Sequence, residues 1–283
     1  MACLGLALAA PALAQSPCAL DDAPCEVPTG TYRVEWPAGP GPWPVLVFLH
    51  GAGSNGNAIL SNRVLVETFL EGGMAVLAPD GTARPGRPST ALGWSFIPGR
   101  PKRRDEHSFL SAVIDDATQR FPLDRARVVL SGFSLGGSMT WYMACDHPDL
   151  AFAYAPVGGA FWRPHPALEA CKAPVRLFHT HGWKDKVVPL EGRPLWDGRI
   201  VQGDVFYSLQ VMRTANACEG MRAGAFEISE KYWDRWWTEC ASGSALRLAL
   251  HPGAHSVPTG WSLRTLAWLD SLAGFARDST ASP

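Results

Sequence analysis

Runs of consecutive apolar residues alternate along this chain with segments whose apolar residues have helical spacing. A continuous apolar run predicts a strand covered on both faces, whereas helical spacing predicts a helix with one buried face. Such strands are predicted at residues 45–49, 74–78, 128–130, 151–157, 175–179 and 246–250, with an edge strand at 31–36. Helices are predicted at residues 59–70, 105–120, 138–145, 205–217 and 261–275. This alternation predicts an α/β fold, with a mostly parallel central sheet and helices on both of its faces, in one domain.

The most specific signal is the junction between the predicted strand 128–130 and the predicted helix that follows it. It reads Gly132-Phe133-Ser134-Leu135-Gly136, the G-x-S-x-G pattern of a nucleophile elbow. A serine on so sharp a turn needs neighbours without a Cβ, and the following helix directs its N-terminal N–H groups toward the serine. Ser134 is therefore the predicted nucleophile.

A serine hydroxyl needs an adjacent base, which in turn needs a carboxylate to orient it. In a parallel sheet these groups lie beyond the carboxyl ends of strands. His255 follows the last predicted strand within a glycine-containing turn and is the predicted base, with His251 as the alternative. Asp185 follows another predicted strand and is the predicted acid, with Asp197 and Asp204 as alternatives.

A glycine-rich turn, His50-Gly51-Ala52-Gly53, follows the predicted strand 45–49. Such a turn allows a backbone N–H to face a substrate carbonyl, beside the N–H that follows the nucleophile. We therefore predict an oxyanion hole formed by the N–H groups of Ala52 and Leu135.

The N-terminus has the pattern of an export signal. An apolar run at residues 4–10 is followed by Ala12-Leu13-Ala14, an A-x-A cleavage pattern. We predict a signal peptide over residues 1–14 and a single mature domain over 15–283, in a secreted or periplasmic protein. The absence of Lys or Arg before the run suggests that the natural start lies upstream, and a buried N-terminal helix is the alternative interpretation.

Six cysteines remain after the predicted cleavage: Cys18, Cys25, Cys145, Cys171, Cys218 and Cys240. An even number in an exported chain predicts disulfides. Proximity in the sequence favours Cys18–Cys25 and Cys218–Cys240, which leaves Cys145 with Cys171. A zinc site is the competing interpretation, but no C-x-x-C or clustered Cys/His spacing supports it.

The composition is that of an ordinary globular protein, with 47% hydrophobic and 18% charged residues. The formal net charge of −1 provides no general attraction to nucleic acid or to an anionic membrane. We expect a monomer with neither of these partners.

Taken together, the motifs resemble the polyhydroxybutyrate depolymerase/feruloyl esterase family of α/β-hydrolases. The resemblance rests on the turn at 50–53, the elbow, residues 181–189 and Gly253-Ala254-His255, and it extends over nearly the whole mature chain. It implies the α/β-hydrolase fold, a secreted serine carboxylic-ester hydrolase, Asp185 as acid and His255 as base. The pair Cys218 and Cys240 is similar to a family disulfide. Residues 93–96 lack the usual cysteine of the family and residues 190–203 have no counterpart, so polymer specificity is not implied.

Substrate specificity is predicted to depend on the long loop at residues 82–104, with Trp94 lining the acyl or alcohol pocket. The alternative is that Trp94 only packs against the domain. Trp233, Trp236 and Trp237 are interpreted as packed residues, with a polymer-binding platform as the alternative. The basic run 100–104 is expected to be a solvated surface loop, although it could attract an anionic substrate.

These observations predict a serine esterase that cleaves its ester substrate through an acyl-enzyme, without a metal or an organic cofactor. A serine peptidase or an acyltransferase would use the same residues. A non-catalytic polymer-binding protein is the alternative from another class.

Overall fold

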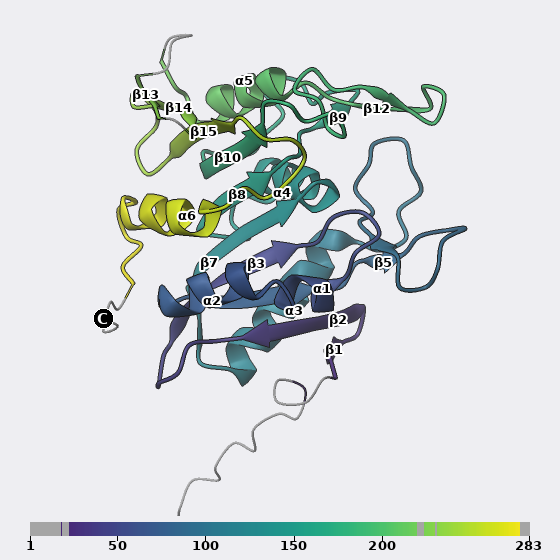
Figure 1. The fold of residues 1–283 in the computed structure, drawn as a ribbon, viewed down its shortest axis with the longest axis vertical. Helices are drawn as coiled ribbons and strands as arrows, with labels where there is room; N and C mark the ends of the chain where they lie inside the picture. The colour runs from purple at the N-terminus through teal and green to yellow at the C-terminus, as the bar shows by residue number, and fades with distance from the viewer. Residues whose placement is uncertain (1–17, 19–22, 220–223, 230, 278–283) are drawn as a thin grey trace, which may run out of the picture.

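The computed structural model describes residues 18, 23–219, 224–229 and 231–277, and its main feature is a ten-stranded sheet (Figure 1). In order across the sheet, the strands are β1 (Cys25–Val27), β2 (Gly30–Glu35), β4 (Ala75–Pro79), β3 (Trp43–Leu49), β7 (Leu123–Phe133), β8 (Ala153–Val157), β10 (Arg176–Gly182), β15 (Ala245–His251), β14 (Trp233–Trp237) and β13 (Ala225–Ile228). The six central strands, β4 to β15, pair in parallel, and antiparallel strands extend both edges. The predicted mostly parallel sheet is confirmed.

Helices cover both faces of this sheet (Figure 1). One face packs against α3 (Glu106–Arg120), α4 (Leu135–Asp146) and α5 (Val205–Ala215), and the other against α1 (Gly56–Leu60), α2 (Arg63–Glu71) and α6 (Trp261–Asp270). The side chains of β3 alternate between the two layers, because Val45 and Val47 belong to one core cluster and Leu46 and Phe48 to the other. This explains why the strand is a continuous apolar run.

Two local predictions were wrong. The helix expected at 59–70 is divided into α1 and α2, because the side chain of Asn62 accepts a hydrogen bond from the Leu65 N–H and caps a new helix. The strand expected at the edge of the sheet, β2, lies one position inside it, since β1 folds back against it in an antiparallel pair.

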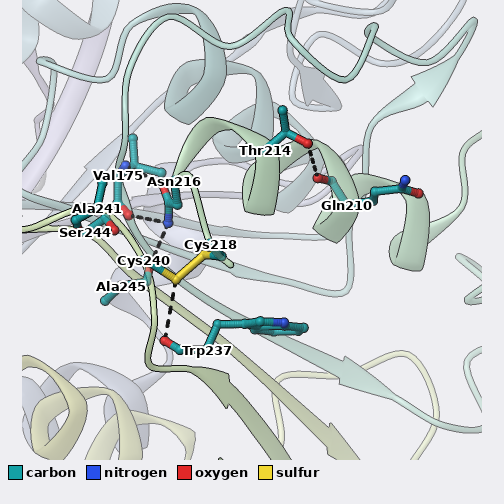
Figure 2. Close-up of a disulfide and its surroundings, with 10 residues drawn as sticks. All are labelled: Val175, Gln210, Thr214, Asn216, Cys218, Trp237, Cys240, Ala241, Ser244 and Ala245. Carbon is teal, nitrogen blue, oxygen red and sulfur yellow. Dashed lines mark hydrogen bonds between the residues drawn. A yellow bond between two sulfur atoms is a disulfide. The ribbon is translucent and has the colours of Figure 1, made fainter. Parts of the chain in front are cut away.

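Three disulfides join the predicted pairs, Cys18–Cys25, Cys145–Cys171 and Cys218–Cys240. Figure 2 shows that the third lies at the end of α5, beside Asn216. The Asn216 side chain accepts from the Val175 N–H at 2.8 Å and donates to the Val175 carbonyl at 2.9 Å. These contacts attach the end of α5 to the start of β10.

Two small ladders lie outside the main sheet. One pairs β5 (Thr82–Ala83) with β6 (Leu92–Gly93), and the other joins β11 (Pro194–Leu195), β12 (Ile200–Gln202) and β9 (Trp162–Arg163). Figure 1 shows that the loops carrying β5 and β12 extend on the same side of the molecule. The predicted signal peptide lies outside the described residues. In the part of the chain that is described, no helix is long and apolar enough to cross a membrane.

Candidate active site

Ser134 lies on a sharp turn between β7 and α4. Its backbone has φ 58° and ψ −116°, a conformation that a residue with a side chain rarely adopts and that is concentrated at functional sites. The turn is held by hydrogen bonds on both sides: the Ser134 N–H donates to the Val157 carbonyl at 2.9 Å, and the Ser138 N–H donates to the Ser134 carbonyl at 2.8 Å. The strain is therefore maintained by the adjacent strand and helix.

The glycines around Ser134 are required by close backbone contacts. A Cβ added to Gly136 would lie 2.2 Å from the Leu49 carbonyl oxygen, and one added to Gly132 would lie 2.6 Å from the Gly136 carbonyl carbon. Neither neighbour can move aside, because both are backbone atoms. Both positions therefore require glycine, because a side chain would not fit between β3, β7 and α4.

Ser134, His255 and Asp185 are in direct contact, although the chain separates them widely. His255 Nε2 lies 2.8 Å from Ser134 Oγ, and His255 Nδ1 lies 2.6 Å from Asp185 Oδ2. Because the carboxylate can only accept, Nδ1 carries the hydrogen in this contact, and Nε2 is left free to accept from the serine hydroxyl. This is the arrangement in which an imidazole can take a proton from serine.

The three residues meet because each follows a strand at the same edge of the sheet. Ser134 comes directly after β7, Asp185 three residues after β10, and His255 four residues after β15. The ring of Phe133 packs against the His255 ring, with centroids 4.6 Å apart.

Asp185 is buried and is held by backbone donors. Its Oδ1 accepts from the N–H groups of Val187 at 2.9 Å and Val188 at 2.8 Å. Burial alone would raise the pKa of Asp185, but the hydrogen bonds from His255 and Val188 outweigh it and hold the pKa below its ordinary value. The carboxylate is therefore charged at neutral pH, as the contact with His255 Nδ1–H requires.

Two buried histidines behind Asp185 were missed as part of the site. His181 Nε2 lies 2.8 Å from the Val188 carbonyl oxygen and 3.5 Å from Asp185 Oδ2, while His181 Nδ1 lies 3.0 Å from His179 Nε2. Burial lowers the pKa of both rings. His181 thus supports the turn that presents Asp185. The sequence signal that could have identified His181 as part of the site is its position at the start of the motif 181–189.

The alternative base and acids lie elsewhere. His251 is the last residue of β15, is 4% exposed, and accepts from the Gly253 N–H through Nδ1 at 3.2 Å. Asp204 caps α5 by accepting from the Tyr207 N–H, and Asp197 is an exposed turn residue. None of the three contacts Ser134 or is bonded to His255 within the described structure.

The two N–H groups predicted for the oxyanion hole belong to residues that line one cavity together with Ser134. Within the described residues, neither Ala52 N–H nor Leu135 N–H donates to a protein acceptor. The turn that carries Ala52 is fixed by the loop 82–104, because Gly53 N–H donates to the Leu92 carbonyl at 2.8 Å and Trp94 Nε1–H donates to the His50 carbonyl at 2.9 Å. Both free donors are thus available to an anionic oxygen at the serine.

The cavity beside Ser134 has a volume of about 570 Å³, a size suited to a small organic ligand. Its walls come from the loop 82–104 and from the segment around β11 and β12. Trp94 reaches the wall but is only 2% exposed and belongs to the larger core cluster. Trp94 thus lines the cavity, as predicted, but most of its indole fills the space under the turn at His50. Its contact with substrate stays a prediction.

Two other sequence interpretations are also resolved. Trp233 and Trp237 lie on one face of β14 and Trp236 on the other, so the three do not form one platform. Trp237 is packed, at 9% exposed, but the packed interpretation is wrong for Trp233, which is 42% exposed. The basic run is only partly a solvated loop, because Arg104 is buried in an ion pair with Glu106, at 2.7 Å.

A model of the phospholipase/carboxylesterase family matches residues 104–196. The putative esterase NocK of Nocardia uniformis subsp. tsuyamanensis is 29% identical over 160 residues, which cover 55% of this chain and 44% of that protein. The bifunctional acetylxylan esterase/xylanase of Neocallimastix patriciarum is 31% identical over 147 residues, covering 51% of this chain and 20% of that protein. The probable feruloyl esterase C of Aspergillus oryzae is 24% identical over 156 residues, which cover 52% of this chain and 51% of that protein. The matches thus span about half of these relatives or less.

Solved structures share the fold over nearly the whole chain. The acetyl xylan esterase from Aspergillus awamori has a TM-score of 0.62 at 13% identity and covers 84% of this chain and 93% of that one. Esterase PE8 has a TM-score of 0.58 at 17% identity, and the match covers 86% of this chain and 98% of that one. The chain therefore has the α/β-hydrolase fold. The sequence matches described above are to the phospholipase/carboxylesterase family and to putative, acetylxylan and feruloyl esterases.

Proposed function

We propose that the protein is an exported serine carboxylic-ester hydrolase that works through an acyl-enzyme. The observation that carries this proposal is the continuous contact from Ser134 Oγ through His255 to Asp185. The esterase relatives favour an ester over a peptide as the substrate, and water over other compounds as the acyl acceptor. The polyhydroxybutyrate depolymerase part of the sequence resemblance stays a prediction.

In the first half of the reaction, Ser134 Oγ attacks the ester carbonyl carbon while His255 Nε2 takes the hydroxyl proton. Asp185 keeps the other ring nitrogen protonated and stabilises the imidazolium. The negative charge that develops on the carbonyl oxygen is held by the N–H groups of Ala52 and Leu135. The C–O bond to the alcohol then breaks, and His255 returns the proton to the leaving alkoxide.

In the second half, water attacks the acyl-serine with His255 again as the base. Collapse of the second tetrahedral intermediate releases the carboxylic acid and regenerates the Ser134 hydroxyl. Each half consumes and returns one proton at His255, so the chain's own residues complete the cycle.

Export is supported by the three disulfides, because disulfides persist in oxidising compartments. The predicted signal peptide agrees with this location. We therefore assign the protein to the periplasm or the extracellular space, where an ester in the surroundings of the cell would be its substrate.

The test is labelling with a fluorophosphonate, combined with turnover of 4-nitrophenyl acetate. The native protein should gain one adduct by intact mass, and Ser134→Ala should gain none and lose nearly all turnover, keeping only the rate due to binding and the oxyanion hole. Ser89→Ala, in an exposed part of the loop 82–104, is the matched control and should behave as the native protein. A folded Ser134→Ala variant with native turnover would reject the proposal.

A further inference from the structure

The cavity beside Ser134 is lined by an unusual concentration of positive charge. None of its lining residues is Asp or Glu, whereas five are arginines, namely Arg84, Arg87, Arg100, Arg103 and Arg193. This is a local feature, since the formal net charge of the whole chain is −1. The cavity therefore has a positive potential, although the chain as a whole is nearly neutral.

Three of these arginines are held in place by neutral groups. Arg103 Nε–H donates to Thr82 Oγ1 at 2.9 Å, and Arg193 Nε–H donates to the Val187 carbonyl at 2.9 Å. The Arg100 guanidinium lies over the Trp196 ring, 4.9 Å from its centroid, and so connects the two loops that form the walls. Among the described residues, no carboxylate lies within ion-pair distance of any of the five.

Arg104, in the same basic run, shows the contrast. It is buried against Glu106, and its guanidinium lies 3.4 Å from the centroid of the Phe109 ring. Its charge is compensated inside the protein. By contrast, the five arginines of the cavity wall have no carboxylate partner among the described residues, so their charges can attract a bound anionic group.

Arg84 brings this positive charge to the reacting centre. A Cβ added to Gly53 would lie 3.6 Å from Arg84 Nη1, and one added to Gly93 would lie 3.1 Å from Arg84 Cδ and 3.4 Å from Leu135 Cδ2. Arg84 therefore lies beside the turn of Ala52 and beside Leu135, the two residues assigned to the oxyanion hole. A substrate bound at Ser134 would share the cavity with the Arg84 guanidinium.

We propose that the cavity selects esters that carry a separate carboxylate group, on either the acyl or the alcohol part. This inference rests on the proposed esterase function and specifies its substrate class. Guanidinium groups bind carboxylates through paired, charge-assisted hydrogen bonds. The apolar residues between the arginines, including Trp162, Ile97 and Leu195, would contact the rest of the substrate.

The test compares two matched pairs of substrates. On the alcohol side the pair is 4-acetoxybenzoate and its methyl ester, and on the acyl side it is mono-4-nitrophenyl glutarate and its methyl ester. Each kcat/KM is corrected for the rate of hydroxide-catalysed hydrolysis. We expect the charged member of at least one pair to be preferred by roughly tenfold or more at low salt, and the preference to fall as NaCl is added. The pair that shows the preference identifies the side that carries the charge.

Arg84→Gln and Arg103→Gln should each lower this preference by roughly fivefold, about 1 kcal/mol in differential binding. The matched control is Arg125→Gln, which removes the same charge near the opposite end of β7, where Arg125 pairs with Asp115. Melting temperatures check that each variant is folded. An equal preference in Arg103→Gln and Arg125→Gln, or hydrolysis of the neutral esters with no preference in the native protein, would overturn this inference alone. Failure to hydrolyse any ester, with no labelling of Ser134, would overturn the proposed function and this inference together.

Discussion

Replacing Trp94 by alanine should destabilise the protein and slow every ester substrate to a similar degree. The indole is 2% exposed and packs in the larger core cluster, with its ring centroid 4.8 Å from that of His50. Truncation of a buried tryptophan costs about 3–5 kcal/mol of unfolding free energy. For a domain near this size, about 2–4 °C of melting temperature is lost per kcal/mol. The melting temperature should therefore fall by roughly 6–20 °C.

The kinetic effect follows from the hydrogen bond that Trp94 donates to the His50 carbonyl. His50 is the first residue of the turn that carries Ala52, and its ring Nε2 accepts from the Gly81 N–H at 3.0 Å. Loss of the indole loosens this turn and so misplaces one oxyanion donor. Since every ester needs that donor, kcat should fall in similar proportion for all substrates.

The assay is differential scanning calorimetry together with kcat/KM for a series of 4-nitrophenyl esters of increasing acyl length. Trp94→Phe is the control, because it keeps an aromatic ring in the core while it removes the N–H donor and part of the buried volume, and it should have an intermediate melting temperature. The reasoning is refuted if Trp94→Ala keeps the native melting temperature while it changes the order of preference among the esters. That result would instead make Trp94 a substrate contact.

Three further predictions concern the acid and the disulfides. Asp185→Asn should lower kcat by roughly 10⁴-fold, because the amide no longer fixes the His255 tautomer; kcat within tenfold of native would exclude Asp185 as the orienting acid. Because the folded pKa of Asp185 is lowered, its contribution to stability is present above the ordinary carboxyl value, about 3.9, and is lost as the pH falls through the lower folded value. Chemical denaturation of the native protein should therefore show this loss only below about pH 4, and Asp185→Asn should lack it. Titration of the denatured, unreduced mature protein should detect no free thiol, since the six described cysteines form three disulfides; two or more thiols per chain would contradict an oxidising location.

The linear sequence was sufficient for the α/β architecture and for the residues that meet at Ser134. Continuous apolar runs identify strands buried on both faces, and the carboxyl ends of parallel strands must lie at one edge of the sheet. Ser134, Asp185 and His255 each follow such a strand, so their proximity follows from local patterns and one topological rule. Their catalytic roles stay predictions that the proposed experiments test.

Other features depend on which segments the fold brings side by side, which no local pattern records. Trp94 is buried because the turn at His50 lies directly over it, 44 residues away in the sequence. His179 and His181 support the turn that presents Asp185 only because β10 ends beside β8 and β15.

The arginine-lined cavity is the clearest example. Arg84, Arg100 and Arg103 belong to one loop and Arg193 to another, and the basic run gave no sign that one of its members, Arg104, would be neutralised while its neighbours faced a cavity. The charge of each residue can be read from the sequence, but the electrostatic potential at a site depends on which charged groups lie within a few ångströms of it. Only the tertiary structure sets those distances.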